Sequence, residues 1–231
     1  MATDPTKKRL LEAAGQEFAE KGFEGATVRS ILQRAGIKNI AAINYYFGDK
    51  EQLYIQAVIE AHRCGVEWPP EEEVVRGEPA EQLRRYVRHF LSHVLALDEE
   101  SRWHHALMLR ELFQPTIASQ TLVREVIRPK FERLLALLRR IHPEADERRL
   151  HATAFSIVGQ CLHYRMGRSV SRQLIGPEAF ARLDLDYLTD HITDFSLAAL
   201  GLGGPLDFGG APHSDGASAA EEGKTACTGS R

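Results

Sequence analysis

The stretch from residue 21 to residue 50 holds the side chains best suited to binding a phosphate group. Five basic residues stand there against two acidic ones: Lys21, Arg29, Arg34, Lys38 and Lys50 against Glu24 and Asp49. Lys50 falls in the first turn of an expected helix, where free backbone N–H groups and a lysine together suit a phosphate. The positive excess is modest, and a solvated helix face is the alternative reading.

Two short helices joined by a tight turn are expected to position these groups. Thr27 is a good N-cap, and apolar residues follow at helical spacing as far as Gly36, which permits a left-handed turn. Asn39 can cap a second short helix, in which Ile43 and Phe47 share one face. This arrangement is that of a helix-turn-helix.

A longer helix on each side is expected to brace this pair. The preceding helix has an apolar stripe that ends at Gly22 and consists of Leu10, Leu11, Ala14 and Phe18. The following helix, residues 50–61, begins with a capping-box-like pair, Asp49 and Gln52.

Two ungapped segments of this region resemble the TetR-type bacterial transcription regulators. They are KGFEGATVRSILQRAGI, residues 21–37, and AINYYFGDKEQLY, residues 42–54. The resemblance covers about the first quarter of the chain. It implies a small N-terminal DNA-binding domain, followed by a larger helical domain that dimerises and holds an inducer.

The resemblance also implies contacts with DNA for ten residues. Thr27 and Arg29 would begin the second helix against the DNA, where Arg29 can read a guanine edge with two hydrogen bonds. The exposed side of the recognition helix would carry Lys38, Asn39, Ala41, Ala42 and Asn44, and phosphates would be held by Tyr45, Tyr46 and Lys50. Many family members carry tyrosine at the position of Asn44 and glycine or threonine at those of Ala41 and Ala42. The operator sequence therefore does not carry over.

The rest of the chain reads as helical, with a boundary where the periodicity breaks. Trp68, two prolines and three glutamates interrupt the pattern, and Gly77 with Pro79 begins a new helix. No segment alternates with period two, so the expected fold is all-α. The expected divisions are a DNA-binding domain at 1–66, a linker at 67–78, a dimerisation and ligand-binding domain at 79–202, and a disordered tail at 203–231.

Three further segments resemble one subgroup of the family, the CecR-like regulators. They are RELFQPT at 110–116, IRPKF at 127–131 and SIVGQCLHYRMGRS at 156–169. Pro129 lies inside a helical pattern, so a kink or break is expected near Arg128.

The C-terminal helices also suggest a ligand pocket and a dimer interface. Aromatic bulk with polar tips suits a pocket between helices, although a plain core explains it equally well: Trp103, Met108, Phe113, Phe155, His163 and Tyr164. Helices at 147–167 and 185–200 carry more apolar surface than one neighbour can cover, which predicts a four-helix bundle across a two-fold axis. The expected interface residues are Ile157, Cys161, Leu188, Ile192 and Phe195.

An all-helical enzyme or metal protein is the alternative. His104, His105 and Glu111 would then do chemistry, but the sequence has no nucleophile elbow, phosphate loop or clustered carboxylates. His89 and His93 have metal-ligand spacing without a nearby carboxylate or cysteine. We therefore expect no enzymatic activity, no metal and no cofactor.

Composition suggests an ordinary cytoplasmic protein. The formal net charge is -3, so any DNA binding must be local. Three widely spaced cysteines, Cys64, Cys161 and Cys227, indicate neither a disulfide framework nor a zinc knuckle. No apolar run approaches the roughly 20 residues of a membrane span. The expected function is a ligand-responsive homodimeric regulator, most often a repressor in this family, which binds palindromic operator DNA and an unidentified inducer.

Overall fold

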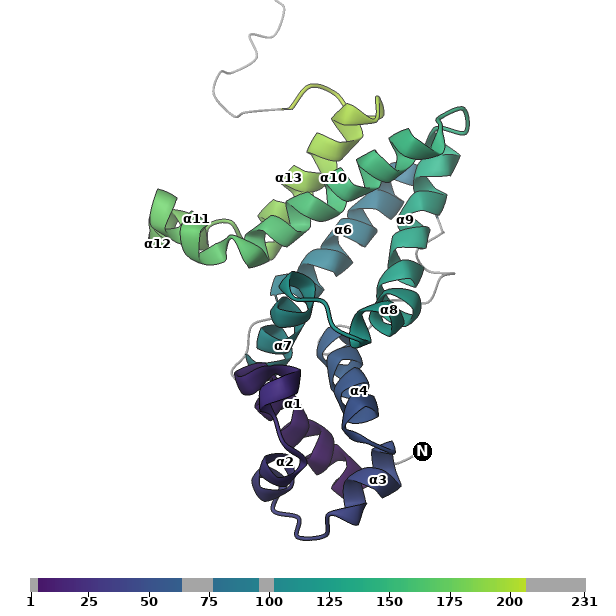
Figure 1. Cartoon of the computed structure of the whole chain (residues 1–231). Helices are drawn as coiled ribbons and strands as arrows, with labels where there is room; N and C mark the ends of the chain where they lie inside the picture. The colour runs from purple at the N-terminus through teal and green to yellow at the C-terminus, as the bar shows by residue number, and fades with distance from the viewer. Residues whose placement is uncertain (1–3, 64–76, 96–101, 207–231) are drawn as a thin grey trace, which may run out of the picture.

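The computed structural model describes residues 4–63, 77–95 and 102–206 as a helical protein (Figure 1). In these residues every regular element is a helix, which confirms the expected all-α fold. None of the described helices is both long and apolar enough to cross a lipid bilayer. The elements are α1 (Pro5–Gly25), α2 (Val28–Ala35), α3 (Ala41–Phe47), α4 (Lys50–Arg63), α6 (Pro79–Leu95), α7 (Arg102–Phe113), α8 (Ala118–Leu122), the π-helical turn η1 (Val123–Ile127), α9 (Arg128–Ile141), α10 (Glu147–Met166), α11 (Arg168–Ile175), α12 (Pro177–Ala181) and α13 (Leu185–Ala199).

The molecule is elongated, and its two ends have separate cores (Figure 1). Helices α1 to α4 form the end at the bottom of the view, and α6, α9, α10 and α13 form the other end. Helix α7 lies beside α1, and α8 lies above α4. Helices α11 and α12 project to one side.

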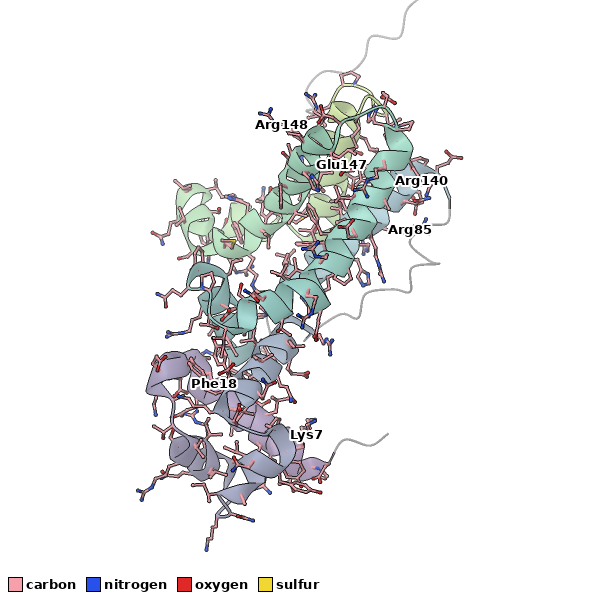
Figure 2. The ribbon with its side chains drawn as sticks, turned by 45° about the vertical axis from the view of Figure 1, so that its right-hand side comes forward. Lys7, Phe18, Arg85, Arg140, Glu147 and Arg148 are labelled. Carbon is pink, nitrogen blue, oxygen red and sulfur yellow. The ribbon has the colours of Figure 1, made fainter. Side chains whose placement is uncertain are left out.

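The N-terminal core is completed by helices from beyond the expected boundary. Phe18 is fully buried at its centre and meets the ring of Tyr54 edge-on, with 4.9 Å between centroids (Figure 2). Trp103 and Leu107 of α7 belong to the same cluster, as do Ala118, Leu122 and Val126 further along. The first 66 residues therefore do not close their own core. Most of the expected linker and of the expected tail lies outside the described residues.

The C-terminal core corrects the expected dimer interface. Ile157, Cys161, Leu188 and Ile192 are 0–2% exposed, and their partners are α6 and α9 residues of the same chain. Ion pairs from Arg84 and Arg88 of α6 to Asp190 and Asp186 of α13 hold these helices together. An apolar stripe on a helix predicts that its residues are buried, but it does not tell whether they pack against the same chain or against a second copy. Of the five expected interface residues, Phe195 is exposed, at 46%.

The break expected near Arg128 takes the form of a wide π turn. Val123–Ile127 is π-helical, and the Arg128 N–H bonds to the Val123 carbonyl, five residues earlier. Pro129, at the start of α9, has no N–H to continue the ladder of α-helical hydrogen bonds. The turn therefore joins α8 to α9 without a loop. Helices α11 and α12, separated by Gly176 at φ 84°, were not expected from the sequence.

Candidate nucleic-acid interface

Helix α2 begins and ends on side-chain and glycine caps. The Thr27 hydroxyl accepts the Ser30 N–H at 3.1 Å, and the Ser30 hydroxyl accepts the Thr27 N–H at 3.2 Å, which makes a reciprocal capping box. Gly36 adopts φ 66°, so the Ile37 N–H reaches the Leu32 carbonyl at 2.9 Å. Arg29 lies in the first turn and is exposed.

Helix α3 presents a mixed polar and aromatic face to solvent. The Asn39 carboxamide oxygen accepts the Ala41 N–H at 3.0 Å in the turn before the helix, whose N-cap is Ile40 and has no side-chain cap. Asn44 and Tyr45 are exposed, Tyr45 at 81%. Lys38, Asn39 and Ala41 are exposed with them.

Ala42 is a correction to the expected DNA contacts. It is only 9% exposed and packs in the N-terminal core with Ile43 and Phe47. Ile43 and Phe47 lie four residues apart on the core-facing side of α3, and Ala42 is buried next to them, so it does not belong to the exposed face of the helix. Asn44 and Tyr45 are left to occupy that face.

An ion-pair cluster fixes α2 against α1. Arg34 contacts Glu17 at 2.9 Å and Glu20 at 2.6 Å, and Lys21 also pairs with Glu17. Burial raises the pKa of Glu17, but the hydrogen bonds and charges of its basic partners outweigh this and lower it overall. Arg9 adds a hydrogen bond to the Ala35 carbonyl at 2.5 Å. Arg34 therefore holds α2 in place against α1.

Three of the expected phosphate contacts already have partners within the fold. The Tyr46 hydroxyl donates to Asp4 at 2.8 Å, and this bond lowers the pKa of Asp4 and raises that of Tyr46. The Tyr45 ring stands edge-on to Tyr46, with centroids 4.8 Å apart. The Lys50 ammonium lies over the Phe23 ring, 4.5 Å from its centroid. By contrast, Arg29 and Lys38 make no ion pair with any residue in the described part of the chain.

The expected pocket residues differ widely in their packing and exposure in the described part of the chain. Trp103 lies in the N-terminal core, where its indole N–H donates to Glu12 at 2.7 Å. Phe113 and Phe155 are 66% and 63% exposed, and Phe155 stacks on Phe131 at 4.9 Å. The remaining three are half-buried Met108 of α7, and exposed His163 and half-buried Tyr164 of α10.

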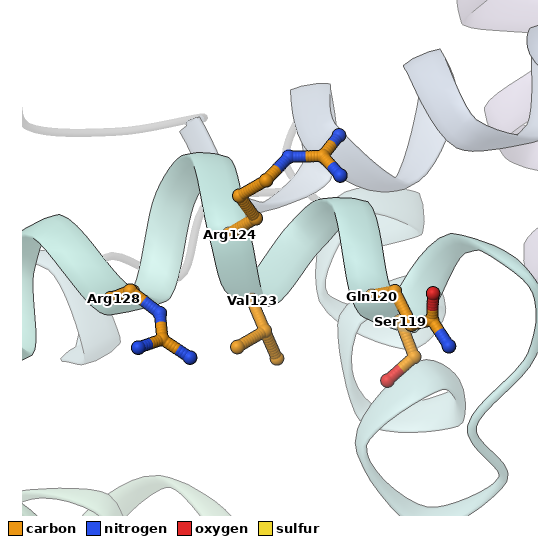
Figure 3. Close-up of a pocket in the computed structure, with 5 residues that line it drawn as sticks. All are labelled: Ser119, Gln120, Val123, Arg124 and Arg128. Carbon is orange, nitrogen blue, oxygen red and sulfur yellow. The ribbon is translucent and has the colours of Figure 1, made fainter.

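A hollow of 530 Å³ opens instead on the outer side of α8, η1 and α9 (Figure 3). Its lining comprises Ser119, Gln120, Val123, Arg124 and Arg128, so two guanidinium groups stand at a hollow whose surface is otherwise largely apolar. None of the six expected pocket residues belongs to it. Sequence reasoning missed this hollow because the π turn that spaces the two arginines has no local sequence pattern.

One of the groups that the alternative enzyme hypothesis invokes, Glu111, has a structural role. Glu111 is 2% exposed and accepts hydrogen bonds from the Tyr54 hydroxyl at 2.9 Å and from the Thr116 N–H at 2.8 Å. It therefore joins α4 to α7. The described residues contain no group of three or more histidine, cysteine, aspartate or glutamate side chains placed to hold a metal ion.

Comparisons with known proteins agree with this layout. Residues 10–57 match the family described as bacterial regulatory proteins, tetR family, and residues 79–200 match the C-terminal domain of the HTH-type transcriptional dual regulator CecR. CecR of Shigella flexneri is 27% identical over 206 residues, which are 82% of this chain and 89% of that protein. The HTH-type transcriptional repressor AcnR of Corynebacterium efficiens is 38% identical over 104 residues, 42% of this chain and 54% of that protein.

Solved structures show the same fold. HlyIIR, a hemolysin II transcriptional regulator, aligns with a TM-score of 0.55 at 22% identity, over 82% of this chain and 97% of that one. PfmR of Thermus thermophilus, a TetR-family regulator, gives 0.54 at 20% identity over the same shares. At these levels of sequence identity, the comparison shows a shared fold and no more.

Proposed function

The chain belongs to the tetR family of bacterial regulatory proteins and has a CecR-type C-terminal domain, and from this premise we propose that it is a homodimeric repressor released from its operator by a small molecule. The general role follows from the family, since the chain is a DNA-binding regulator of transcription. Repression is proposed by similarity to AcnR, which is described as a repressor. Release from DNA by a bound ligand is common in this family, and in this chain the C-terminal domain would bind that ligand.

The observation that carries the DNA-binding proposal is the unpaired basic and polar face of α2 and α3. Arg29 and Lys38 make no ion pair with another described residue, and Asn44 and Tyr45 are exposed beside them. The ion pairs of Arg34 with Glu17 and Glu20 fix α2 against α1. Rigid backbone with free side chains suits base-edge reading in a major groove.

An aromatic stripe on α13 supports the dimer. Tyr187, His191 and Phe195 recur every four residues, and Tyr187 and Phe195 are 54% and 46% exposed. Their rings form a continuous row, with centroids 6.2 Å and 6.4 Å apart. A second copy of the chain would cover this row across a two-fold axis and would set two α3 helices in successive major grooves.

Helix α4 is the route by which a ligand would reach the DNA-reading pair. It starts at Lys50 beside α3 and ends at Arg63 near α8 and α9 (Figure 1). Tyr54 of α4 bonds to Glu111 of α7, so a shift of the C-terminal helices would be transmitted to α4.

The test is DNA binding by the purified chain. A gel shift with DNA from beside its own gene should give a complex of two chains per palindromic site, and unrelated DNA should bind much more weakly at the same salt concentration. Equal binding of both DNAs would rule out a sequence-specific regulator. A stoichiometry of one chain per palindrome would rule out the dimer.

A further inference from the structure

We propose that the small molecule that regulates this protein carries a carboxylate, and that the carboxylate binds at a buried basic cluster formed by His62, His93 and Arg165. The three residues lie near the ends of α4, α6 and α10. The inference rests on the proposed function and deepens it by naming the class of ligand and the groups that bind it.

Arg165 is the centre of the cluster. Its side chain is only 8% exposed, and one terminal nitrogen, Nη1, donates to the Val94 carbonyl at 2.5 Å. The other terminal nitrogen, Nη2, is buried without a hydrogen-bond partner in the described structure. Burying a guanidinium N–H away from water without a hydrogen-bond acceptor destabilises the fold. A bound carboxylate would remove this destabilisation, because arginine and carboxylate form strong charge-assisted hydrogen bonds.

Two buried histidines lie close enough to feel the charge of Arg165, and each gains a further N–H donor when its ring is protonated. Nδ1 of His93 is buried and has no hydrogen-bond partner among the described residues. His62 is 9% exposed, and its Nδ1 lies 2.9 Å from the Val58 carbonyl, which leaves Nε2 for another group. Burial, then the positive charges of Lys130 and Arg165, lowers the pKa of both rings to about 4. Both rings are therefore neutral near pH 7 until an anion arrives.

The electrostatic surroundings favour a negative guest. Lys130 of α9 is half-buried, and its pKa is lowered to about 8 by burial and by the charges of Arg63 and Arg133. His105 of α7 and Arg168 of α11 act on the cluster as well, and His104 of α7 is buried. None of the charged neighbours that shift these pKa values in the described chain is a carboxylate. The partial negative charges at the ends of α4, α6 and α10 offset this only in part, because each is about half a unit charge.

The position of the cluster links such a ligand to DNA binding. His62 lies in the last turn of α4, and Lys50 begins the same helix beside α3. A carboxylate that draws His62 and Arg165 together would displace the far end of α4. By linkage, an anion that weakens operator binding must itself bind more weakly in the presence of operator, by the same factor.

The experiment compares benzoate with its neutral isostere benzamide by isothermal titration calorimetry on the full chain. Benzoate should bind at least about tenfold more tightly than benzamide, which is roughly 1.4 kcal/mol. Binding should take up protons, because the guest anion raises the pKa of His62 and His93. The measured enthalpy should therefore change with the ionisation enthalpy of the buffer, and affinity should rise as the pH is lowered from about 8 to about 6.

Matched variants locate the site. Arg165→Met keeps an unbranched apolar stem and removes the guanidinium, and His93→Gln keeps a polar group; each should weaken benzoate at least about tenfold while circular dichroism stays unchanged. Arg128→Gln removes a guanidinium from the outer hollow and should leave benzoate affinity unchanged. Loss of binding in Arg128→Gln with retention in Arg165→Met would overturn the proposal, as would equal binding of benzoate and benzamide.

The outcomes also separate this inference from the proposed function. Operator DNA released by a neutral compound, with no benzoate binding, would leave the proposed function standing and remove the carboxylate site. Benzoate bound at Arg165 by a chain that binds no operator DNA would support the site and remove the proposed function.

Discussion

The hydroxyl of Tyr54 donates a hydrogen bond to the carboxylate of Glu111 across 2.9 Å, and both residues are almost completely buried. This contact joins α4, which follows the DNA-reading helices, to α7, which packs on the N-terminal core from beyond the expected domain boundary. Burial is the main cause that raises the pKa of Tyr54 to about 12, so the phenol remains a donor at physiological pH.

Removing that donor should destabilise the fold. Tyr54→Phe leaves the Glu111 carboxylate buried with one partner fewer, so the free energy of unfolding should fall by about 1–3 kcal/mol. Urea unfolding followed by circular dichroism measures this loss. Tyr45→Phe, which removes a hydroxyl from an exposed ring, is the control and should be neutral. Equal stability of the two variants would mean that the buried bond contributes nothing.

Two basic residues should affect DNA affinity in different ways. Arg29→Ala should cost about 1–3 kcal/mol on operator DNA and relax sequence preference, because a base-edge contact is lost. Lys38→Ala should weaken all DNA sequences alike and reduce the salt slope by about one, as expected for a phosphate contact.

Fluorescence anisotropy titrations at several salt concentrations separate these effects. Arg124→Ala, an exposed arginine on the C-terminal half, is the matched control and should change neither quantity. If Arg29→Ala bound operator as tightly as the unchanged chain, the outer face of α2 would not be the reading surface.

Substitutions one helical turn apart on α13 should have opposite consequences. Phe195→Asp places a charge on an exposed position, so the chain should stay folded and become monomeric. Ile192→Asp buries an unpaired charge in the core, where Ile192 is 1% exposed, and should unfold the chain. Sedimentation equilibrium and circular dichroism report the two outcomes. A Phe195→Asp chain that remains dimeric would place the interface elsewhere.

Mild acid should destabilise the protein through the buried histidines. His62 has a pKa of 6.5 when unfolded and about 4 in the fold, so the unfolded chain binds more protons between these values. Stability from His62 is therefore fully present above about pH 6.5 and is lost as the pH falls toward 4. The expected loss between about pH 7 and about pH 5 is on the order of 2 kcal/mol.

His62→Gln isolates this contribution. The variant should show a shallower fall in urea stability over the same pH range, since one titrating group is gone. Most carboxylates stay ionised down to about pH 5, so the comparison is made above that value. Identical pH profiles for the variant and the unchanged chain would mean that His62 is protonated at its ordinary pKa in the fold.

The local elements could be predicted from the sequence because their determinants are local. Thr27 and Gly36 cap the two ends of α2 and Asn39 closes the turn before α3 by contacts within a few residues, and the structure has each of these contacts. Pro129 likewise marks a break that its missing N–H imposes. Helices α11 and α12 were missed because they are short, with eight and five residues, so that any apolar repeat extends over too few turns to stand out.

The candidate site could be predicted less well from the sequence where contacts between distant residues determine which side chains are buried. Trp103 has the composition of a pocket residue, but its ring lies on Gly15, eighty-eight positions earlier, where an added β-carbon would stand 2.1 Å from it. Ile192 has the pattern of an interface residue, but α6 of its own chain covers it. The burial of Arg165 could not be predicted from the sequence, because its hydrogen-bond partner is a backbone carbonyl on another helix.

The position of Trp103 makes it an internal optical reporter. The chain contains two tryptophans, Trp68 and Trp103, so Trp68→Phe leaves a single indole. That indole is 7% exposed, sits between α7 and α1, and donates its N–H to Glu12. Any movement of α7 against α1 would change the polarity around the ring and shift its emission. Binding of DNA at one end and of a ligand at the other could then be followed in the same cuvette, without attaching a dye.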